Sequence, residues 1–445
     1  MTHYGACGIV PLCVLLLVGA GLAMPAHAAG PADTPAMGWN SWDCFGASVT
    51  EAEVRANAEY MAAHLKRFGW TYIVVDIQWS EPGATAFEYS RGARLMMDRY
   101  GRLIPATNRF PTAKDGRGFR TLSDWIRSKG LKFGIHLMRG IPRQAVDART
   151  PILGTRYTAA DIADRVHVCD WNTDMYGVDM TKPGAQEYYD SVFKLFAEWG
   201  IDYVKVDDLT QPYSTAEVEA IRRAIDRSGR TMVFSGSPGE TPLSCAAHAV
   251  AHLNSWRVSD DLWDEWPLLR AEFDYAAAWS PYAGPGHWPD LDMLPLGHIG
   301  IRSHAPDRRS NFTPDEQRTM MTLWCMCRSP LMMGGHLPDD GQDLDSLLTN
   351  EEVLAIHRKS SGNHEHIRRG DLIVWTARAK GGTLYVALFN VGARPLSAAL
   401  PLADLGLVGE RRPRDLWERR DEAPIRERIS AELPPHGCRL FRLSE

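Results

Sequence analysis

The sequence has little cysteine and no concentration of positive charge. Its 8 cysteines are scattered along 445 residues, without the spacing of a zinc site or of a disulfide framework. The net charge is −6, and no basic run is long enough to follow a phosphate backbone. These absences argue against a disulfide-stabilised scaffold, a zinc module and a nucleic-acid partner. We predict no particular disulfide.

Charged residues are missing altogether from the N-terminus, since the first 28 residues contain no Lys, Arg, Asp or Glu. An apolar run from Ile9 to Met24 precedes Ala26-His27-Ala28, a small-x-small cleavage pattern. Residues 1–28 are therefore predicted to be a signal peptide for export to the periplasm or the medium. A retained anchor is the alternative, because the usual positive charge is absent. The run is short and contains Pro11, so we expect no stable membrane association.

The length exceeds what one hydrophobic core usually supports, so we expect two domains. Short apolar runs alternate with helix-like segments from about residue 36 to 335, which is typical of a parallel sheet with crossover helices. This predicts an α/β fold, a (β/α)₈ TIM barrel over residues 29–340. The eight candidate strands are 37–42, 72–79, 132–138, 203–207, 231–235, 253–257, a weaker one near 291–294, and 330–333.

Helical apolar spacing occupies residues 52–68 and 185–199, and Thr313-Pro314-Asp315-Glu316 has the form of a capped helix start. From about residue 345 the pattern changes to short alternating strands, such as 372–377 and 383–389, broken by Gly and Pro turns. We predict a small antiparallel β domain over residues 345–445.

Two aspartates follow predicted strands, and each has a cation nearby. Asp207 closes an apolar run, and Lys205 precedes it by two residues on the same strand face, where it favours an ionised carboxylate. Asp261 comes shortly after the predicted strand 253–257, with Arg257 available to orient a sugar or a carboxylate. Glycoside hydrolysis needs one ionised carboxylate and one proton donor. We predict Asp207 as the nucleophile and Asp261 as the acid/base. Anomeric configuration is retained if the carboxyls lie about 5 to 5.5 Å apart.

An isolated pair of this kind has a structural alternative, in which Asp207, Asp208, Asp260 and Asp261 cap helices or face water. Tryptophans near the predicted strand ends shift the balance towards a sugar site, although some must belong to the core. These residues are Trp39, Trp42, Trp79, Trp256, Trp263, Trp266 and Trp288.

Together these segments resemble glycoside hydrolase family 27, the α-galactosidase family, from about Thr34 to the C-terminus. The motifs that carry the resemblance are Met37-Gly-Trp-Asn-Ser-Trp42-Asp43, Val74-Val-Asp76-Ile77-Gln-Trp79, Lys205-Val-Asp207, Trp256-Arg257-Val-Ser-Asp260-Asp261 and Trp288-Pro-Asp-Leu-Asp292-Met293-Leu. The resemblance implies a barrel followed by a C-terminal β-sandwich, with no metal or organic cofactor. It also implies a sugar site shaped by Trp42, Asp76, Lys205 and Arg257.

Three departures from the family pattern fall at positions that contact the sugar or cross-link the site. Ile77 stands where family α-galactosidases usually carry a second Asp, which binds hydroxyls on the C4 to C6 side of galactose. Gln78 replaces a cysteine that is often bridged. His136 replaces a common Tyr, and it is either a sugar ligand or a buried, satisfied imidazole.

The change to Ile77 bears on the substrate, because β-L-arabinopyranose has the hydroxyl pattern of α-D-galactose without the C6 hydroxymethyl group. An apolar residue suits the missing group, whereas a galactose hydroxyl would lose a partner, a difference of about 1 to 3 kcal/mol. Asp76 remains available to bind O6. We predict an exported exo-glycosidase acting on oligosaccharide or polysaccharide side chains, an α-galactosidase with β-L-arabinopyranosidase as the alternative.

Two further classes are weaker. A non-catalytic carbohydrate-binding barrel would keep the tryptophans without the chemistry. A metal-dependent hydrolase is suggested by the histidines alone, but no His-Glu-x-x-His run occurs, and the only His-x-His, at His364 and His366, falls in the predicted β domain. The histidines in question are His136, His252, His287, His298, His304 and His336.

Overall fold

The computed structural model describes residues 30–85, 89–339, 342–379 and 381–445, and the predicted signal peptide lies outside them. Within these ranges, no helix is both long enough and apolar enough to cross a membrane. Everything from Pro31 to Glu445 forms one compact unit.

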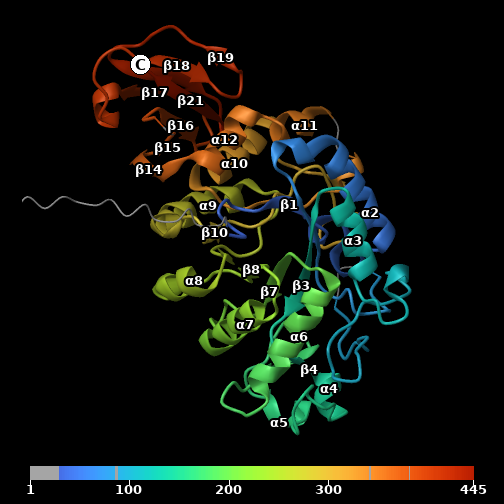
Figure 1. Ribbon diagram of the computed structural model, residues 1–445. Coiled ribbons are helices and arrows are strands. Elements are labelled where there is room, and N and C mark those ends of the chain that lie inside the picture. The colour runs from blue at the N-terminus through green and yellow to red at the C-terminus, as the bar shows by residue number, and fades with distance from the viewer. Residues whose placement is uncertain (1–29, 86–88, 340–341, 380) are drawn as a thin grey trace, which may run out of the picture. The chain divides into compact units, whose positions relative to one another are not determined.

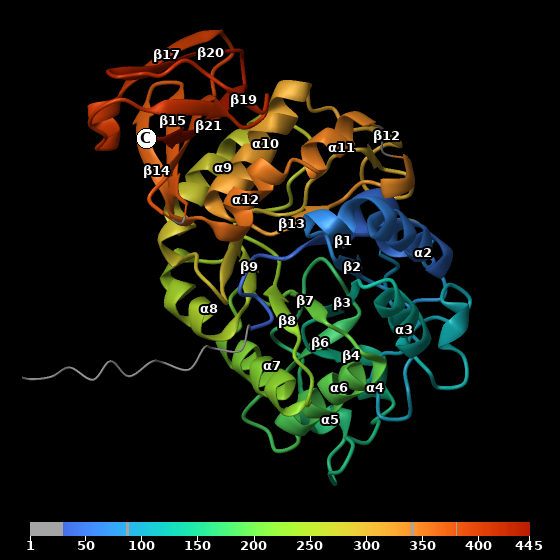
Figure 2. The same cartoon turned by 45° about the horizontal axis from the view of Figure 1, so that its top comes forward.

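Eight parallel strands form the central sheet of the N-terminal part (Figures 1 and 2). Their order is β10-β9-β8-β7-β3-β2-β1-β13. The segment that follows β10 meets the other edge strand, β13, through an isolated parallel bridge between Leu294 and Met333, which closes the barrel. The strands are β1 (Met37–Asn40), β2 (Tyr72–Val75), β3 (Lys132–Met138), β7 (Tyr203–Asp207), β8 (Val233–Gly236), β9 (Ser255–Arg257), β10 (Trp288–Asp290) and β13 (Leu331–Met333).

The predicted (β/α)₈ barrel is confirmed, with one shifted element. The weak strand expected near 291–294 is β10 at Trp288–Asp290, and Leu294 supplies only the closing bridge. Apolar residues fill both sides of the sheet, as a parallel sheet covered by helices requires. Tyr72, Val74 and Tyr203 pack inside the barrel, and a much larger cluster joins the strands to the helices.

Helices surround the strands in Figure 2. They are α1 (Trp42–Phe45), α2 (Glu51–Tyr60), α3 (Arg120–Ser128), α4 (Arg143–Asp147), α5 (Ala159–Ile162), α6 (Ala185–Trp199), α7 (Thr215–Arg227), α8 (Ala246–His252), α9 (Trp266–Trp279) and α10 (Pro314–Cys327). The predicted helix at 52–68 is α2 continued by a π turn and a 3₁₀ turn to Phe68. Thr313 and Glu316 form the expected capping box of α10.

Loops at the carboxyl ends of the strands carry small sheets that sequence analysis does not anticipate. After β3, three short strands form an antiparallel sheet: β4 (Ile141–Pro142), β5 (Ala163–Asp164) and β6 (Met175–Val178). After β10, a hairpin joins β11 (His298–Ile299) and β12 (Arg308–Arg309). These insertions give shape to the end of the barrel where function is expected.

The C-terminal part begins with helices rather than strands. The strands expected from about residue 345 start only at Ser361, because α11 (Gln342–Leu348) and α12 (Glu351–Lys359) come first. The domain boundaries themselves stay a prediction. The strands are β14 (Ser361–Arg369), β15 (Leu372–Arg378), β16 (Leu384–Asn390), β17 (Leu396–Pro401), β18 (Arg412–Asp415), β19 (Arg420–Asp421), β20 (Arg428–Leu433) and β21 (Cys438–Ser444).

These strands form two antiparallel sheets, one ordered β14-β15-β16-β21-β18-β19 and the other β17-β20. Alternate side chains of both sheets share an apolar core, the arrangement of a β-sandwich. The sandwich packs on barrel helices, since Phe273 of α9 meets Phe389 of β16 edge-on with ring centres 5.0 Å apart. The Trp417 indole also donates a hydrogen bond to Thr322 of α10.

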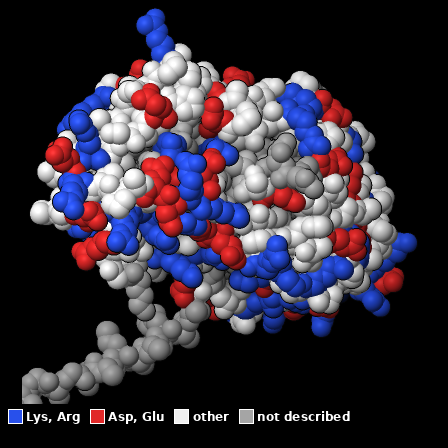
Figure 3. All heavy atoms as spheres, turned by 90° about the horizontal axis from the view of Figure 1, so that it is seen from above, with Lys and Arg blue, Asp and Glu red and all other residues white. Residues whose placement is uncertain are grey.

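Acidic and basic side chains are interspersed on the face seen in Figure 3. Its described residues therefore present no large field of one sign, which agrees with the mixed composition and the modest net charge of −6.

Candidate active site

A cavity of about 550 Å³ opens at the carboxyl ends of the barrel strands. This size is ordinary for a small-molecule site, and barrel enzymes carry their chemistry at this end. Its charged lining residues are Asp43, Asp76, Asp207, Asp260, Asp261, Asp292, Lys205 and Arg257. Its aromatic lining residues include Trp42, Tyr89, Trp171, Trp263 and His304. Most of the residues expected to bind sugar are thus brought together in the lining from four different strands and their loops.

Asp207, the last residue of β7, is nearly buried. The Nε2 atom of His136, on the neighbouring strand β3, donates a hydrogen bond to its Oδ2 atom over 3.0 Å. Burial alone would raise the pKa of Asp207. The His136 hydrogen bond and the charges of Lys205 and Arg257 outweigh burial, so this pKa lies below its usual range. Asp207 is therefore held as a carboxylate, the form that a nucleophile requires.

Lys205 lies two residues before Asp207 on the same strand face, as the strand period requires. Its Nζ atom is 3.1 Å from Oδ2 of Asp76, which also accepts a hydrogen bond from Asn40 over 2.8 Å. Burial disfavours the lysine charge, but Asp76 and Asp207 overcome this effect and raise the pKa of Lys205. A fixed cation consequently lies between two carboxylates.

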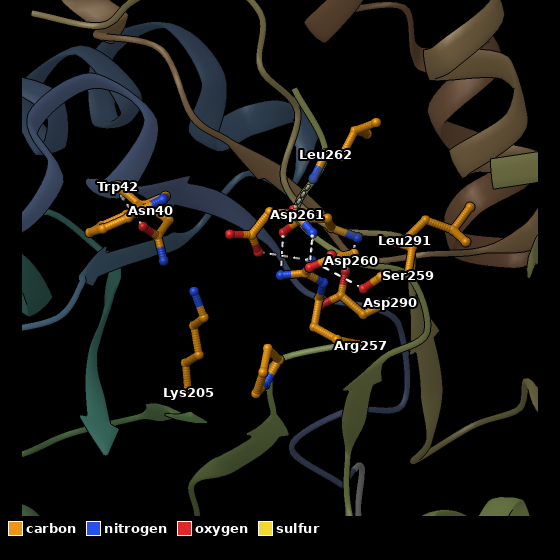
Figure 4. Close-up of polar contacts among 12 residues, drawn as sticks. Asn40, Trp42, Lys205, Arg257, Ser259, Asp260, Asp261, Leu262, Asp290 and Leu291 are labelled. Carbon is orange, nitrogen blue, oxygen red and sulfur yellow. Dashed lines mark hydrogen bonds and ion pairs between the residues drawn. The ribbon is translucent and has the colours of Figure 1, made fainter. Parts of the chain in front are cut away.

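Asp261 has a different environment, because its side chain is 59% exposed whereas that of Asp207 is 13% exposed. Arg257, the last residue of β9, holds one oxygen of Asp261 at 3.3 Å and one oxygen of Asp292 at 2.8 Å. Figure 4 shows Arg257 reaching towards Asp261, while the Lys205 amine points towards Asn40. The predicted pair thus consists of one buried, ionised carboxylate and one solvent-accessible carboxyl.

Further acids crowd the same end of the barrel. Burial raises the pKa of Asp290 to about 6, and Arg257 offsets only part of the effect. Burial, together with the charge of Asp292, raises the pKa of Asp43 well above its usual range. These carboxyls take up protons more readily than ordinary aspartates, so Asp43, which lines the cavity, can donate as well as accept hydrogen bonds.

Aromatic rings form another part of the lining. Tyr89 lies between Trp42 and Trp171, with ring centres 6.0 and 5.6 Å away, and its ring is almost parallel to that of Trp42. Behind Trp42 and Tyr89, Ile77 belongs to a small apolar cluster with Met138, Cys169 and Met175. A sugar ring in the cavity would meet flat apolar surfaces here, a common mode of carbohydrate contact.

Six of the eight predicted site residues line the cavity, and two lie behind it. The six are Trp42, Asp76, Lys205, Asp207, Arg257 and Asp261. Ile77 and His136 are 2% and 1% exposed and line a separate cavity of only about 20 Å³. From this position His136 acts on the site through its hydrogen bond to Asp207, and Ile77 acts through the rings of Trp42 and Tyr89 that pack on its cluster.

The tryptophans divide into core and site. Trp39, Trp79, Trp256 and Trp288 are fully buried, so they belong to the core rather than to a sugar platform. Trp266 stacks on His436 of the β-sandwich, with ring centres 3.8 Å apart. Among the tryptophans expected at strand ends, Trp42 and Trp263 are the ones that line the cavity.

Several lining residues were not among the predicted site residues. Tyr89 and Trp171 come from long irregular loops, which carry no periodic signal that could place them. Asp43 and Asp292 also line the cavity. Both belong to motifs that carry the family resemblance, and this was the one sign in the sequence that they could belong to the site. Asp208, by contrast, has a structural role, since its carboxylate binds the guanidinium of Arg139 at 2.7 Å.

The backbone is strained where strands run into the site. Gln78, Asp208 and Asp292 have φ values of 62°, 57° and 79°, in the left-handed region that favours glycine. Each follows the end of a barrel strand by one to three residues. Strained residues of this kind collect at functional sites, where the surrounding structure enforces them.

Of the histidines that raised the question of a metal hydrolase, His136 and His304 lie at the site, but in the described part of the chain they form no group of metal ligands with its carboxyls. His136 binds Asp207, and His298 bridges Asp307 and Asp339 at 2.6 Å each. In the described part of the chain, one group of metal-ligating side chains stands close enough to share an ion, and it comprises Glu219, His248 and His252. None of its members lines the cavity. Among the cysteines of the described chain, Cys169, Cys245, Cys325, Cys327 and Cys438 are free.

Two carboxyls of unlike environment, facing one sugar-sized cavity at the carboxyl end of a (β/α)₈ barrel, define a glycoside hydrolase. The family model described as alpha galactosidase A matches residues 174–359, and the model of the alpha galactosidase C-terminal beta sandwich domain matches residues 369–443. The chain belongs to glycoside hydrolase family 27.

Solved and curated relatives cover nearly the whole chain. The structure of a family 27 β-L-arabinopyranosidase from Geobacillus stearothermophilus, in complex with arabinose, is 54% identical, with a TM-score of 0.92 and coverage of 93% of this chain and 98% of that one. A protein from Bacillus halodurans with the provisional name alpha-N-acetylgalactosaminidase is 50% identical, with a TM-score of 0.84 over 92% and 97% of the two chains. Alpha-galactosidase 2 of Arabidopsis thaliana is 28% identical over 93% of this chain and 90% of its own.

Proposed function

We propose that the protein hydrolyses terminal β-L-arabinopyranosyl groups. The observation that carries this proposal is the apolar cluster around Ile77, on which Trp42 and Tyr89 pack beside Asp76. β-L-Arabinopyranose leaves no hydroxymethyl group to satisfy on that side of the ring. The 54% identity to an enzyme that carries this activity supports the same choice.

An energetic argument favours the pentose. Ile77, Met138, Cys169 and Met175 form an apolar backing behind Trp42 and Tyr89, so a galactose O6 hydroxyl on that side of the cavity would find no hydrogen-bond partner in it. The loss amounts to about 1 to 3 kcal/mol, or roughly 10 to 150-fold in kcat/KM.

α-Galactosidase activity is the second candidate, and Asp76 is the observation that favours it. Its carboxylate is ionised, because Lys205 and neighbouring hydrogen bonds outweigh burial and lower its pKa. It also lines the cavity, so it is available to accept a bond from O6 as well as from a ring hydroxyl. The curated plant relative is named an alpha-galactosidase.

We infer a double displacement that retains anomeric configuration. Asp207 attacks the anomeric carbon while Asp261 gives its proton to the departing glycosidic oxygen, and a glycosyl ester of Asp207 forms. Asp261 then removes a proton from water, which attacks the same carbon and releases Asp207. The buried, positively surrounded Asp207 suits the first role, and the exposed Asp261 suits exchange of protons with water.

The substrate is tested by comparing kcat/KM for 4-nitrophenyl β-L-arabinopyranoside, α-D-galactopyranoside and N-acetyl-α-D-galactosaminide. We expect the arabinoside to lead the galactoside by roughly tenfold or more. A leading galactoside would make the second candidate correct, and a leading N-acetylgalactosaminide would reject both.

The mechanism is tested separately by NMR of the first-formed sugar, which should keep the substrate's anomeric configuration. A first-formed sugar of inverted configuration would rule out the double displacement. In addition, Asp261→Asn should slow substrates with poor leaving groups far more than 2,4-dinitrophenyl glycosides, which need little proton assistance.

We also propose export of the chain, which rests on the signal-like residues 1–28. N-terminal sequencing of protein recovered from the periplasm or medium should show a chain that starts just after Ala28. Recovery of the uncleaved chain from the membrane fraction would favour the anchor instead.

A further inference from the structure

A compact group of metal-ligating side chains lies on two neighbouring barrel helices, outside the cavity that holds the catalytic carboxyls. Glu219 belongs to α7, and His248 and His252 belong to α8. One ligand atom of each lies within 4.8 Å of the others, and all three residues are partly exposed, so an ion can reach them.

The geometry follows from helix periodicity. His248 and His252 are four residues apart and lie on one face of α8, with rings nearly parallel and centres 4.1 Å apart. The Nε2 atom of His248 is 3.5 Å from Oε1 of Glu219. Ligand atoms about 2.0 to 2.1 Å from a tetrahedral zinc ion stand about 3.4 Å from each other, so this spacing is close to that of a metal site.

Outer contacts orient both imidazoles. Nδ1 of His252 lies 3.0 Å from the backbone carbonyl of His248, to which it donates, leaving Nε2 with a free lone pair. Nδ1 of His248 lies 2.8 Å from the hydroxyl of Tyr213. Ligating histidines usually have such a partner on the other ring nitrogen, because it fixes the tautomer.

We propose that Glu219, His248 and His252 bind a divalent transition-metal cation of the zinc type, with water completing the coordination. One oxygen of Glu219 faces His248, and the other pairs with Arg223 at 3.2 Å. Arg223 keeps the carboxylate ionised but also repels the cation. The site therefore binds with moderate affinity, well short of a buried structural zinc site.

The bound ion would brace the barrel next to the active site. It joins α7 to α8, and through Tyr213 it reaches the loop between β7 and α7. The same loop carries Gln211, which lines the cavity. The cation is thus a stabiliser of the loop that follows Asp207, and it takes no part in bond cleavage.

Isothermal titration of the tag-free chain with zinc chloride at neutral pH tests the site. We expect one zinc ion per chain and a rise in Tm of about 1 to 5 °C at saturation. His252→Gln should weaken binding by about tenfold or more and abolish the rise. His167→Gln removes an exposed histidine that pairs with Asp164 elsewhere, and it should leave both unchanged.

Two more variants locate the ion. Arg223→Gln removes the competing cation and should tighten binding. Asp207→Asn should leave zinc binding unchanged. A loss of zinc binding in this variant would place the ion in the catalytic cavity and overturn the proposal. Equal binding by wild type and His252→Gln, or no saturable binding by wild type, would do the same. If His252→Gln does not fold, anomalous scattering from a zinc-soaked wild-type crystal decides, because a peak must lie between α7 and α8.

Discussion

The lining of the cavity has two parts that are built on different principles. In the charged part, Asp207, Lys205, Arg257 and Asp261 are fixed by ion pairs and hydrogen bonds on strand ends. In the apolar part, Trp42 and Tyr89 are fixed by ring stacking and by the cluster behind them. The difference indicates that strands determine which reaction occurs, whereas loop residues and their support determine which sugar enters.

We expect the largest effect from a substitution that removes a negative charge from the charged part. Asp207→Asn keeps the size of the side chain but cannot form the glycosyl ester, so kcat/KM should fall by about 10⁴-fold or more. Burst and steady-state assays give the loss, and thermal unfolding gives the control for folding. Near-normal turnover in the variant would mean that another group attacks the sugar.

A change in the apolar part should alter selectivity more than rate. Ile77→Asp places a polar group beside Asp76 and should move the ratio of kcat/KM for galactoside over arabinoside upwards by roughly 10 to 100-fold. Ile77→Asn tests the same contact without a second buried charge, and Ile77→Val is the apolar control. An unchanged ratio in both polar variants would show that the cluster does not face the C6 position.

The stacked tyrosine provides a finer test of the same part. Tyr89→Ala removes the ring between Trp42 and Trp171, so KM should rise by about tenfold while kcat changes less. Tyr89→Phe retains the stacking and should stay close to wild type. A large defect in Tyr89→Phe would instead assign the main role to the hydroxyl group.

The smallest effect concerns pH. His136→Phe removes the hydrogen bond that helps to lower the pKa of Asp207, so this pKa should rise and the acid limb of kcat/KM should move to higher pH by about one unit or less. His136→Gln can retain a donor and should shift the limb less.

The sign for stability follows from the lowered pKa in the folded chain. Ionised Asp207 contributes stability above its unfolded pKa, and this contribution disappears as pH falls through the folded pKa. His136→Phe should therefore unfold more readily than wild type near neutral pH, with a smaller difference in acid. A constant difference at every pH would assign the effect to packing alone.

Regular elements could be predicted because their periodicity is strong. The limits of β3, β7 and α6 agree with the residues expected, and the capping box of α10 follows from four residues. β10 was displaced because Trp288-Pro-Asp is a three-residue strand with a proline, too short for an alternating pattern. The helices α11 and α12 were not predicted, because strands were expected from about residue 345.

The charged part of the site was accessible from sequence for a related reason. Asp207 and Lys205 stand on a strand, and Arg257 ends another, so strand order brings them together. Tyr89 and Trp171 stand on irregular loops, whose path depends on tertiary contacts. The burial of Ile77 and His136 behind the cavity also depends on packing, which no single segment encodes.

The left-handed residues Gln78, Asp208 and Asp292 imply a conflict between the stability of the fold and the exact geometry of the site. Each non-glycine residue in this conformation costs about 1 kcal/mol or more, which glycine would avoid. The catalytic end therefore retains strain that selection for heat resistance alone would remove. A search for hardier forms of this enzyme would find Gln78→Gly attractive, and its cost would be the hydrogen bond that Gln78 donates to Asp174 behind the site.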